Sequence, residues 1–342
     1  MSGAPRISVI LLAHDRRKYV VGGVASAVNQ TLPRDRYEIL VYKNFQDPEI
    51  DGYLQRQGVR VFDSPAESRP RSMRTVLEEA RGEVLSFLDD DDRYAPDKLA
   101  AVDRAFSDDP SLGYFHHDFF VMDDTEKLLE RSPFPRLAQR VYIPAGDVRS
   151  RALPPNALKL GFNSSSVSVR RNWLVPFLEL FDRREAELSD AMLIDCALAS
   201  GCAILADPTR LTYYRYHDSW SNILHYSEKS VDRIVDFDTV NIAVLEMVLG
   251  YVPGTPLAAL LEEGLAYLRF HRSLFVERPD WSPRVRDVLH FVADGIHQRD
   301  LGPAYLIPLY VVSRVSRSAA RRAYFRIAGI YRRRAYRSAP GS

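Results

Sequence analysis

The chain has 342 residues, of which 46% are hydrophobic and 27% are charged. This composition is typical of a folded protein with about two domains, and it excludes a disordered, collagen-like or fibrous chain. The two cysteines, Cys196 and Cys202, are too few for a disulfide framework, which favours a reducing compartment. Residues 1–6 lack the apolar core of a signal peptide, and no apolar run reaches the roughly 18 residues of a membrane-spanning helix.

The net charge of +1 conceals an uneven distribution of charge along the chain. Nine arginines and no acidic residue follow Pro303, whereas the rest of the chain has 37 basic and 45 acidic residues. An acidic body with a basic tail predicts that the tail binds an anionic partner.

The first 110 residues alternate between apolar runs and helical patterns. Short apolar runs predict four strands, at 7–12, 38–42, 59–62 and 84–88. Apolar residues at helical spacing predict three helices, at 19–28, 73–80 and 97–106. Strands that alternate with helices predict an α/β fold, a mostly parallel sheet with helices on both faces.

The rest of the chain is less regular. Further strands are predicted at 113–121, 164–169, 203–206 and 211–216, and residues 123–155 are predicted to form loops. Further helices are predicted at 171–181, 187–200, 231–249, 256–275 and 282–297. We therefore expect an α/β domain at 1–221, with halves 1–110 and 111–221, then a C-terminal helical appendage at 222–302 and a tail at 303–342.

Four consecutive aspartates, Asp89 to Asp92, follow the predicted strand 84–88 directly. An acidic run is most often a solvated loop, but this one lies at the carboxyl end of a buried strand, where open parallel sheets bind ligands. A divalent cation such as Mg²⁺ takes one or two carboxylates and completes its shell with substrate phosphates. The run therefore predicts a site for a cation and a diphosphate.

Three segments in the first hundred residues together resemble the family-2 glycosyltransferases, which have the GT-A nucleotide-sugar-binding fold. They are residues 8–16 (SVILLAHDR), residues 26–41 with SAVNQT and YEILV, and residues 80–99 with ARGEVLSFLDDDD and PDKL. Their order and spacing are more specific than any one segment. The resemblance implies that 1–110 is the nucleotide-binding half and that 111–221 is the acceptor-side half.

The family's acidic DXD signature falls on the aspartate run. The resemblance implies that Asp91 ligates Mn²⁺ or Mg²⁺ bridging the donor diphosphate and that Asp90 lies toward the nucleotide. Asp89 is able to replace either of them, because the run offers more than one register.

The resemblance implies that the loop at residues 13–16, which includes Asp15, cups the nucleoside. His14 would stack on the base, or else it faces water. Relatives usually have an acidic pair at the end of the second strand, where this chain has Lys43-Asn44. Asn44 is able to hydrogen-bond a base or ribose, but it brings no negative charge.

A second departure precedes the fourth strand, where relatives often have Ala-Arg-Asn-x-Gly. This chain has Arg69, Arg71 and Arg74 in that segment instead. Arginine forks match diphosphate oxygens, so Arg71 and Arg74 are the preferred donor contacts, and an exposed basic turn is the alternative.

Inverting members of the family place their base in a Glu-Asp or similar pair, which here corresponds to Ser189-Asp190. Without the resemblance, Asp190 would be interpreted as an acidic residue that stabilises the first turn of a helix. The resemblance makes Asp190 the predicted base, which takes the proton of the acceptor hydroxyl as that oxygen attacks the anomeric carbon. Asp195 is expected to face elsewhere on the helix.

The segment 212–221 resembles the Y-R-x-H segment that closes the catalytic domain of the family. It implies that Arg215 neutralises the leaving diphosphate and that His217 is an extra metal ligand or diphosphate contact. A histidine packed at a strand end is the alternative for His217.

The tail combines arginines at helical spacing, at 314, 317 and 321, with aromatic residues at 305, 310, 324, 325, 331 and 336. This pattern predicts a segment that lies in the headgroup region of an anionic membrane. Nucleic-acid binding and packing on the body are the two alternatives, and nucleic acid is not the expected partner.

The function expected from these observations is that of a metal-dependent, inverting glycosyltransferase of the hexosyltransferase type. A UDP- or GDP-sugar would be the donor, and a glycan or lipid-linked glycan at the cytoplasmic face of a membrane the acceptor. A non-catalytic nucleotide-sugar-binding or scaffold protein is the alternative. A sugar-phosphate nucleotidyltransferase is disfavoured, because residues 13–16 contain no glycine.

Overall fold

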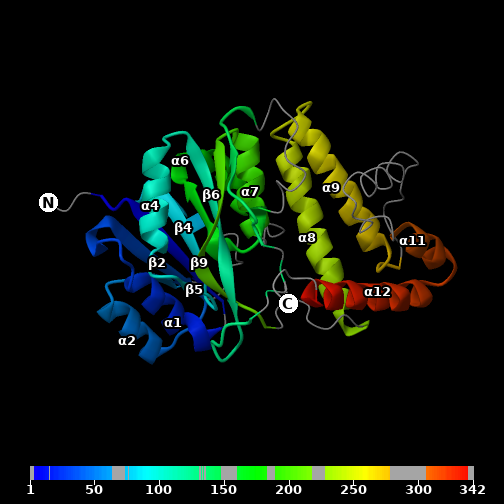
Figure 1. The fold of residues 1–342 in the computed structure, drawn as a ribbon, viewed down its shortest axis with the longest axis horizontal. Coiled ribbons are helices and arrows are strands. Elements are labelled where there is room, and N and C mark those ends of the chain that lie inside the picture. The colour runs from blue at the N-terminus through cyan, green and yellow to red at the C-terminus, as the bar shows by residue number, and fades with distance from the viewer. Residues whose placement is uncertain are drawn as a thin grey trace. The chain divides into compact units, whose positions relative to one another are not determined.

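The computed structural model describes residues 4–14, 16–63, 74–75, 77–130, 132, 134, 136–147, 160–182, 189–217, 228–277 and 306–337. The chain divides into two compact units (Figure 1). The first consists of residues 1–130 and 135–216, and the second of residues 131–134 and 217–342. Each unit has a hydrophobic core of its own.

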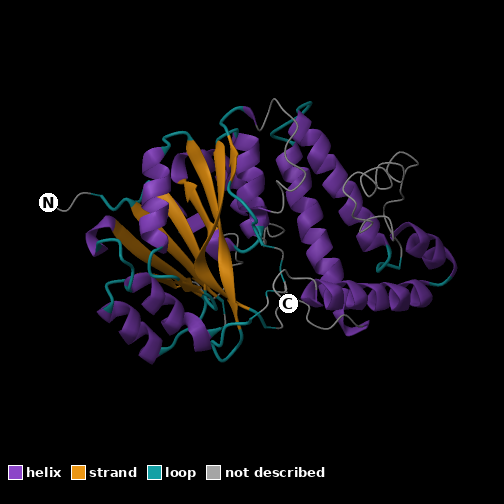
Figure 2. Ribbon diagram, viewed as in Figure 1, coloured by secondary structure: helices purple, strands orange, loops and turns teal. Residues whose placement is uncertain are grey.

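A nine-stranded sheet forms the centre of the first unit, and helices cover both of its faces (Figure 2). The strands are β1 (Ile7–Ala13), β2 (Tyr37–Lys43), β3 (Arg60–Asp63), β4 (Val84–Asp89), β5 (Arg93–Tyr94), β6 (Leu112–Met122), β7 (Val141–Ile143), β8 (Val167–Arg170) and β9 (Ala203–Arg215). Their order is β3-β2-β1-β4-β8-β6-β9-β5, and β7 also pairs with β9.

The sheet is parallel in its first half and mixed in its second. β3, β2, β1 and β4 are parallel neighbours, as are β6 and β9. β8 is antiparallel to β4 and β6, and β5 and β7 are antiparallel to β9. The predicted α/β fold with a mostly parallel sheet is confirmed, and short strands supply most of its antiparallel pairs.

The helices of the first unit are α1 (Arg17–Val28), α2 (Pro48–Arg56), α4 (Lys98–Asp108), α6 (Arg171–Leu174) and α7 (Ser189–Ser200). Short 3₁₀ turns lie at Arg34–Arg36, Ser164–Ser166 and Val175–Asp182. The core contains apolar residues of β1, α1 and α4, among them Val9, Val24 and Leu99. Burial of these side chains fixes α1 and α4 against the strands whose carboxyl ends carry the aspartates.

Several elements differ from the sequence predictions. The predicted strand at 164–169 begins as a 3₁₀ turn, because Asn163 accepts a hydrogen bond from the Ser165 amide at 3.1 Å and diverts the backbone. The two strands predicted at 203–206 and 211–216 are one strand, β9, which pairs with β6 through shifts of register. The strand β7 was not predicted within the loop region 123–155.

The second unit consists of helices α8 (Val231–Leu249), α9 (Pro256–Ser273), α11 (Leu306–Val315) and α12 (Arg317–Arg337). One hydrophobic cluster joins all four, with Ile234, Phe270, Leu309 and Tyr324 among its buried members. Residues of the predicted appendage and of the predicted tail therefore share a core. The helix predicted at 282–297 lies outside the described residues.

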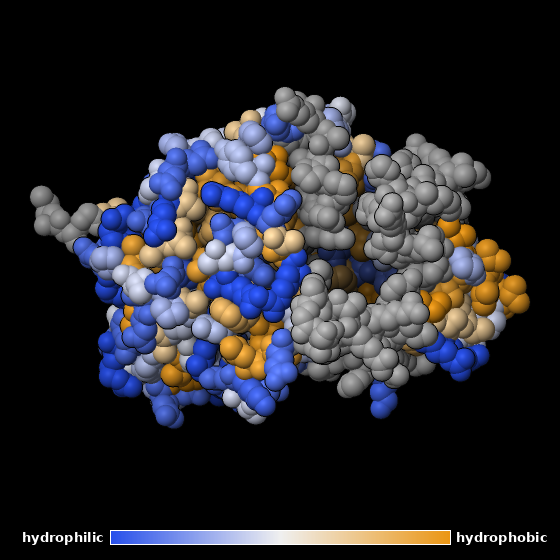
Figure 3. All heavy atoms as spheres, viewed as in Figure 1, coloured by the Kyte–Doolittle hydropathy of each residue, from blue (hydrophilic) through white to orange (hydrophobic). Residues whose placement is uncertain are grey.

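The outer side of α11 carries exposed apolar residues, which gather in the region where Figure 1 labels this helix (Figure 3). Among the described helices, none is both long enough and apolar enough to cross a bilayer.

Candidate functional site

The four aspartates form a tight turn between β4 and β5, which we call the aspartate turn (Asp89–Asp92). Asp89 ends β4, and its carbonyl accepts a hydrogen bond from the Asp92 amide at 3.2 Å. Asp90 and Asp92 are fully buried and Asp91 is only 8% exposed. The run is therefore not a solvated loop, and it lies where the sequence placed it, at the carboxyl end of a buried strand.

Strand register brings other predicted residues to the same edge of the sheet. Leu12 pairs with Asp89, and Ala13 pairs with Lys43. The loops that follow β1 and β2 therefore meet the aspartate turn at the carboxyl ends of three parallel strands. This is the edge at which open α/β sheets bind ligands.

A turn of three serines, Ser164–Ser166, supports the aspartate turn. Ser165 Oγ accepts a hydrogen bond from the Asp89 amide at 2.9 Å. The carbonyl of Ser165 accepts hydrogen bonds from the Lys98 ammonium and from Thr212 Oγ1. Lys98 is fully buried, and burial lowers its pKa although the charges of Asp92 and Asp89 oppose this effect. The serine turn thus fixes Asp89 and places a buried amine close to the carboxylates.

Arg215, at the end of β9, holds the aspartate turn from another side. Its amide donates to Asp92 Oδ1 at 2.8 Å, and its Nε donates to the Asp91 carbonyl at 2.7 Å. The remaining guanidinium nitrogens donate to the carbonyl of Asp123 at 3.1 Å and to Glu126 Oε1 at 3.1 Å. The side chain is 1% exposed. In this conformation Arg215 positions the aspartates, rather than presenting a free fork to a leaving diphosphate.

Replacing Arg215 with methionine is expected to lower the free energy of unfolding by about 3 kcal/mol, because it leaves buried acceptors unpaired. Thermal denaturation measures this loss. Arg210→Met is the matched control on the same strand, since Arg210 is 37% exposed and lies 3.8 Å from Asp118. We expect its effect to stay below about 1 kcal/mol. Equal losses in the two variants would contradict a positioning role for Arg215.

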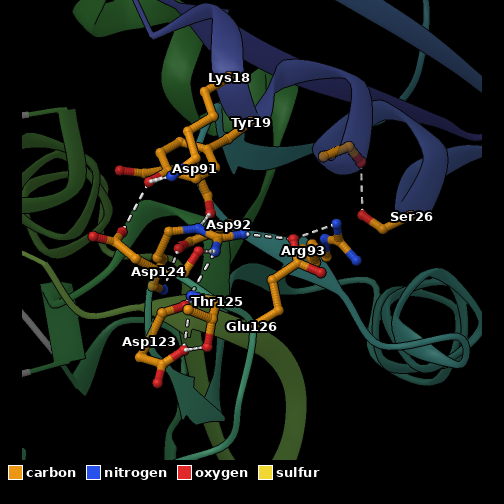
Figure 4. A network of polar contacts seen from close by, with 12 residues as sticks. Lys18, Tyr19, Ser26, Asp91, Asp92, Arg93, Asp123, Asp124, Thr125 and Glu126 are labelled. Atoms are coloured by element: carbon orange, nitrogen blue, oxygen red, sulfur yellow. Dashed lines mark hydrogen bonds and ion pairs between the residues drawn. The ribbon is translucent and has the colours of Figure 1, made fainter.

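A turn at residues 123–126 joins this network, although the sequence indicated only a polar loop there (Figure 4). Glu126 forms an ion pair with Arg93 as well as with Arg215. Tyr19 Oη, on α1, donates to Asp124 Oδ1 at 2.8 Å. The Arg215 guanidinium lies over the Tyr19 ring, 4.2 Å from its centroid. The turn therefore links α1, the aspartate turn and the end of β9.

Close packing of α1 against the aspartate turn depends on Gly23. A Cβ atom at this position would lie 3.3 Å from the Asp92 carbonyl oxygen, which is tighter than most side-chain contacts. The glycine lets the helix approach the turn. The pair Gly22-Gly23 within a predicted helix was the sequence signal for this approach.

The predicted nucleoside side of the site brings together His14, Asn44 and Asp90. The His14 amide donates to Asp90 Oδ2 at 3.0 Å. The Asn44 amide nitrogen lies 3.3 Å from both ring nitrogens of the half-buried His14. Asp90 therefore holds the loop that carries His14, and the Asn44 amide lies against the imidazole.

Lys43 is buried beside this region and neutralises the acids nearest to it. Its ammonium pairs with Asp63, lies 3.0 Å from Asp51 and donates to the Phe45 carbonyl at 2.9 Å. Burial alone would lower the pKa of Lys43, but hydrogen bonds with Asp63 and Asp51 raise it above its usual value. The carboxylates around the end of β2 therefore neutralise the positive charge of Lys43.

Asp89, Asp91 and Asp92 have the geometry of a cation site. One carboxylate oxygen from each lies within 4.8 Å of the others. Asp92 Oδ2 is buried and has no hydrogen-bond partner in the part of the chain that the structure describes. Burial, and then the charge of Asp89, raise the pKa of Asp92 to about 8. A divalent cation fits this set, because it would ligate the orphaned oxygen and stabilise the ionised carboxylate.

Arg16 is a site residue that sequence reasoning did not select. Its guanidinium forms an ion pair with Asp91 and lies 3.6 Å from Asp90 Oδ1. A third of the Arg16 side chain is exposed. Arg16 ends the loop 13–16, which was expected to cup the nucleoside, and this position was the available signal; an arginine in a loop, however, is most often solvated.

Asp190 lies in the first turn of α7 and is half-buried. A Cβ atom at Gly161 would lie 3.4 Å from the Asp190 carbonyl oxygen. Burial is the main cause that raises the pKa of Tyr114, and the charge of Asp190 is the next. Asp195, on the same helix, is 3% exposed, and burial raises its pKa to about 7. Of the two acids, Asp190 is the more exposed, and its role as the base stays a prediction.

Of the four other predicted site residues, two lie outside the described residues and two have a described position. Asp15 and Arg71 lie outside the described residues. Arg74 is half-buried, and its Nε donates to Glu78 one helical turn away at 2.8 Å. His217 lies two residues beyond β9, in the second unit, and it is not in the group formed by Asp89, Asp91 and Asp92. The proposed contacts of Arg74 and His217 with donor or metal stay predictions.

Known proteins resemble this chain in sequence and in fold. The model of the family described as Glycosyl transferase family 2 matches residues 8–152. An uncharacterized glycosyltransferase of Haemophilus influenzae is 31% identical over 100 residues. That match spans 28% of this chain and 40% of the relative's length.

Several solved structures share the fold. The crystal structure of S. aureus TarS 1-349, and the same protein in complex with UDP-GlcNAc, are 14% identical with TM-scores of 0.57. Each comparison covers 93% of this chain and 89% of the TarS chain. The mannosyltransferase PcManGT of Pyrobaculum calidifontis, in complex with GDP-Man and Mn²⁺, is 16% identical with a TM-score of 0.50. This match covers 96% of this chain and 87% of the PcManGT chain. These low identities show a common fold.

Proposed function

We propose that this chain, which belongs to glycosyltransferase family 2 through residues 8–152, transfers a sugar from a nucleotide-diphosphate donor to a hydroxyl acceptor. The transfer would invert the configuration at the anomeric carbon. One observation carries the proposal. Three carboxylates of a buried turn converge at the carboxyl edge of the sheet, and one of them has a buried oxygen with no hydrogen-bond partner among the described residues. A sheet edge of this kind is suited to a metal-bound diphosphate.

The chain's own residues supply binding, positioning and proton transfer. Asp89, Asp91 and Asp92 would hold Mn²⁺ or Mg²⁺, which when bound neutralises charge on the diphosphate. Asp90 holds the loop of His14, which would contact the nucleoside together with Asn44. Arg215 and the serine turn keep the carboxylates in place before the donor arrives.

The reaction itself is a direct displacement. The acceptor oxygen bonds to the anomeric carbon from the face opposite the nucleotide, while the bond from that carbon to the diphosphate breaks. The electron pair of the broken bond goes to the diphosphate, and the acceptor proton goes to the Asp190 carboxylate. The half-buried position of Asp190 supports this role, because a base must be accessible to its acceptor.

We propose a uridine or guanosine nucleotide sugar as the donor. Structural neighbours that share the fold were solved with UDP-GlcNAc, with UDP and with GDP-Man and Mn²⁺. Arg16 joins Arg71 and Arg74 as a candidate contact for the diphosphate, because its guanidinium already reaches Asp91. The proposed acceptor is a glycan carried by a lipid at the cytoplasmic face of a membrane, a proposal supported by the arginine-rich C-terminal residues.

A thermal-shift panel of nucleotides and nucleotide sugars, with and without Mn²⁺, tests the proposal. We expect uridine or guanosine diphosphates with Mn²⁺ to raise the melting temperature by about 5 °C at saturating concentration. Without the metal the shift should largely disappear. If no nucleotide gives a Mn²⁺-dependent shift, the proposal is wrong. Binding without transfer or hydrolysis of any bound donor would instead support a non-catalytic nucleotide-sugar-binding protein.

A further inference from the structure

We propose that the exposed side of α11 is a docking surface for an anionic lipid bilayer. We call this surface the valine edge; it consists of Val311, Val312 and Val315. The proposal deepens the proposed function, since it names the residues by which the enzyme would reach a lipid-carried acceptor. The contacts that support it belong to the second unit alone.

The valine edge is left free by the way α11 packs. The inner side of the helix is buried, with Leu306 1% and Leu309 5% exposed. Tyr310 contacts Phe270 of α9, with ring centroids 5.1 Å apart. The hydrophobic cluster of the second unit includes Leu306 and Leu309 but none of the three valines.

The exposure of the valines is unusually large for one short helix. Val315 is 91% exposed, Val311 63% and Val312 40%. Isolated exposed apolar residues are common on soluble proteins, but contiguous apolar patches mark binding surfaces. Figure 3 shows apolar side chains gathered where Figure 1 places α11. The edge therefore needs a partner with an apolar layer.

The charges of the two C-terminal helices select the partner. Arg314, next to Val315 in the sequence, is exposed on α11, and Arg322 and Arg326 are exposed on α12. No acidic residue lies between 306 and 337. A bilayer with anionic headgroups satisfies both features, because arginines bind the headgroups while the valines enter the acyl boundary. A second copy would bring arginines against arginines, and a nucleic acid offers nothing to the valines.

The same contacts show how α12 is held. Tyr324 Oη lies 2.8 Å from His271 Nε2, and His271 Nδ1 lies 2.7 Å from Asp238 Oδ2. Tyr324 is 6% exposed and Asp238 is 2% exposed. Arg321 also donates to the Phe275 carbonyl. Deleting residues 303–342 would therefore open the core of the second unit, so the docking surface has to be tested by surface substitutions.

The experiment uses the full chain with vesicles of phosphatidylcholine, with or without about one-third phosphatidylglycerol, in a flotation assay. The parent is expected to float with the anionic vesicles, and less so as salt increases. The variant Val311→Ser/Val312→Ser/Val315→Ser should lose at least about tenfold in vesicle affinity. Val315→Asp serves as a second variant, because a side chain that is 91% exposed tolerates a charge without unfolding. Val21→Ser and Val175→Ser, at exposed valines of the first unit, should float like the parent.

Three outcomes would overturn the proposal. The first is a parent that does not float with anionic vesicles. The second is a triple variant and a Val315→Asp variant that both float like the parent. The third is self-association or nucleic-acid binding that depends on the valines and occurs in place of vesicle binding. Donor binding, measured by calorimetry on the same proteins, separates this proposal from the proposed function. A chain that floats but binds no nucleotide sugar supports the docking surface and contradicts the transferase.

Discussion

Alanine in place of Asp91 is expected to lower Mn²⁺-dependent donor affinity by at least about a hundredfold, and turnover by at least as much, because a bound metal contributes several kcal/mol through charge stabilisation. Isothermal titration calorimetry with a nucleoside diphosphate, at fixed Mn²⁺, measures the first effect. Metal-free donor binding should change much less. The loss should therefore lie in the metal-dependent part of binding.

The geometry explains why this one carboxylate should matter so much. Asp91 is the only aspartate of the turn that the structure pairs with Arg16 and places in the three-carboxylate group. Its removal leaves Asp89 and Asp92, and burial already favours the protonated form of Asp92. The two remaining acids would hold a divalent ion weakly.

Asp108→Asn is the matched control for this experiment. Asp108 ends α4, is exposed and lies outside the three-carboxylate group. Asp108→Asn removes the same charge from the chain as Asp91→Ala does, so it corrects for the change in net charge. Unchanged Mn²⁺-dependent binding in the Asp91→Ala variant would refute the role of Asp91 as a ligand.

Most of the first unit's fold could be predicted from local patterns. The apolar runs that became β1, β2 and β4 are continuous because these strands are buried on both faces. Helix α2 was missed, although Asp47 accepts hydrogen bonds from the amides of Glu49 and Ile50 and Pro48 begins the helix. Asp-Pro at a helix start was the signal that could have found it.

The site could be predicted only in part, because its supports come from distant positions in the chain. Asp89 to Asp92 stand out as a run, and position after a strand was enough to identify them. Ser165 and Arg215 are 76 and 123 residues away from the aspartates that they bond. Helical or strand periodicity contains no information about such pairs, so these supports were visible only in the structure.

The C-terminal helices show a different limit of sequence patterns. Tyr310 and Tyr324 were interpreted as aromatic residues at a membrane interface. In the structure Tyr324 is buried and bonded to His271, and Tyr310 packs against Phe270. Helical spacing gives both sides of an amphipathic helix the same period, so it does not say which side meets the protein. The valines, rather than the tyrosines, form the exposed apolar side.

Asparagine in place of Asp190 is expected to reduce turnover by about a hundredfold to ten-thousandfold while donor affinity and melting temperature stay unchanged. The substitution keeps the shape of the side chain and removes its ability to take a proton from the acceptor. Release of the nucleoside diphosphate in the presence of acceptor measures turnover, and calorimetry measures donor affinity. Loss of both together would indicate a structural role instead.

Asp195→Asn is the control on the same helix, and its effect should be on stability. The pKa of this buried carboxyl is about 7, against 3.8 for the unperturbed group. The contribution of Asp195 to the free energy of unfolding is therefore expected to decline as the pH rises from about 4 to 7, because the unfolded chain ionises this group first. The asparagine variant lacks this decline, so its advantage in melting temperature should grow over that range and stay constant above it. If Asp190→Asn has the turnover of the parent, Asp190 is excluded as the base. If the melting temperature of Asp190→Asn rises relative to the parent between about pH 4 and 7, as expected for Asp195→Asn, Asp190 is a buried structural acid.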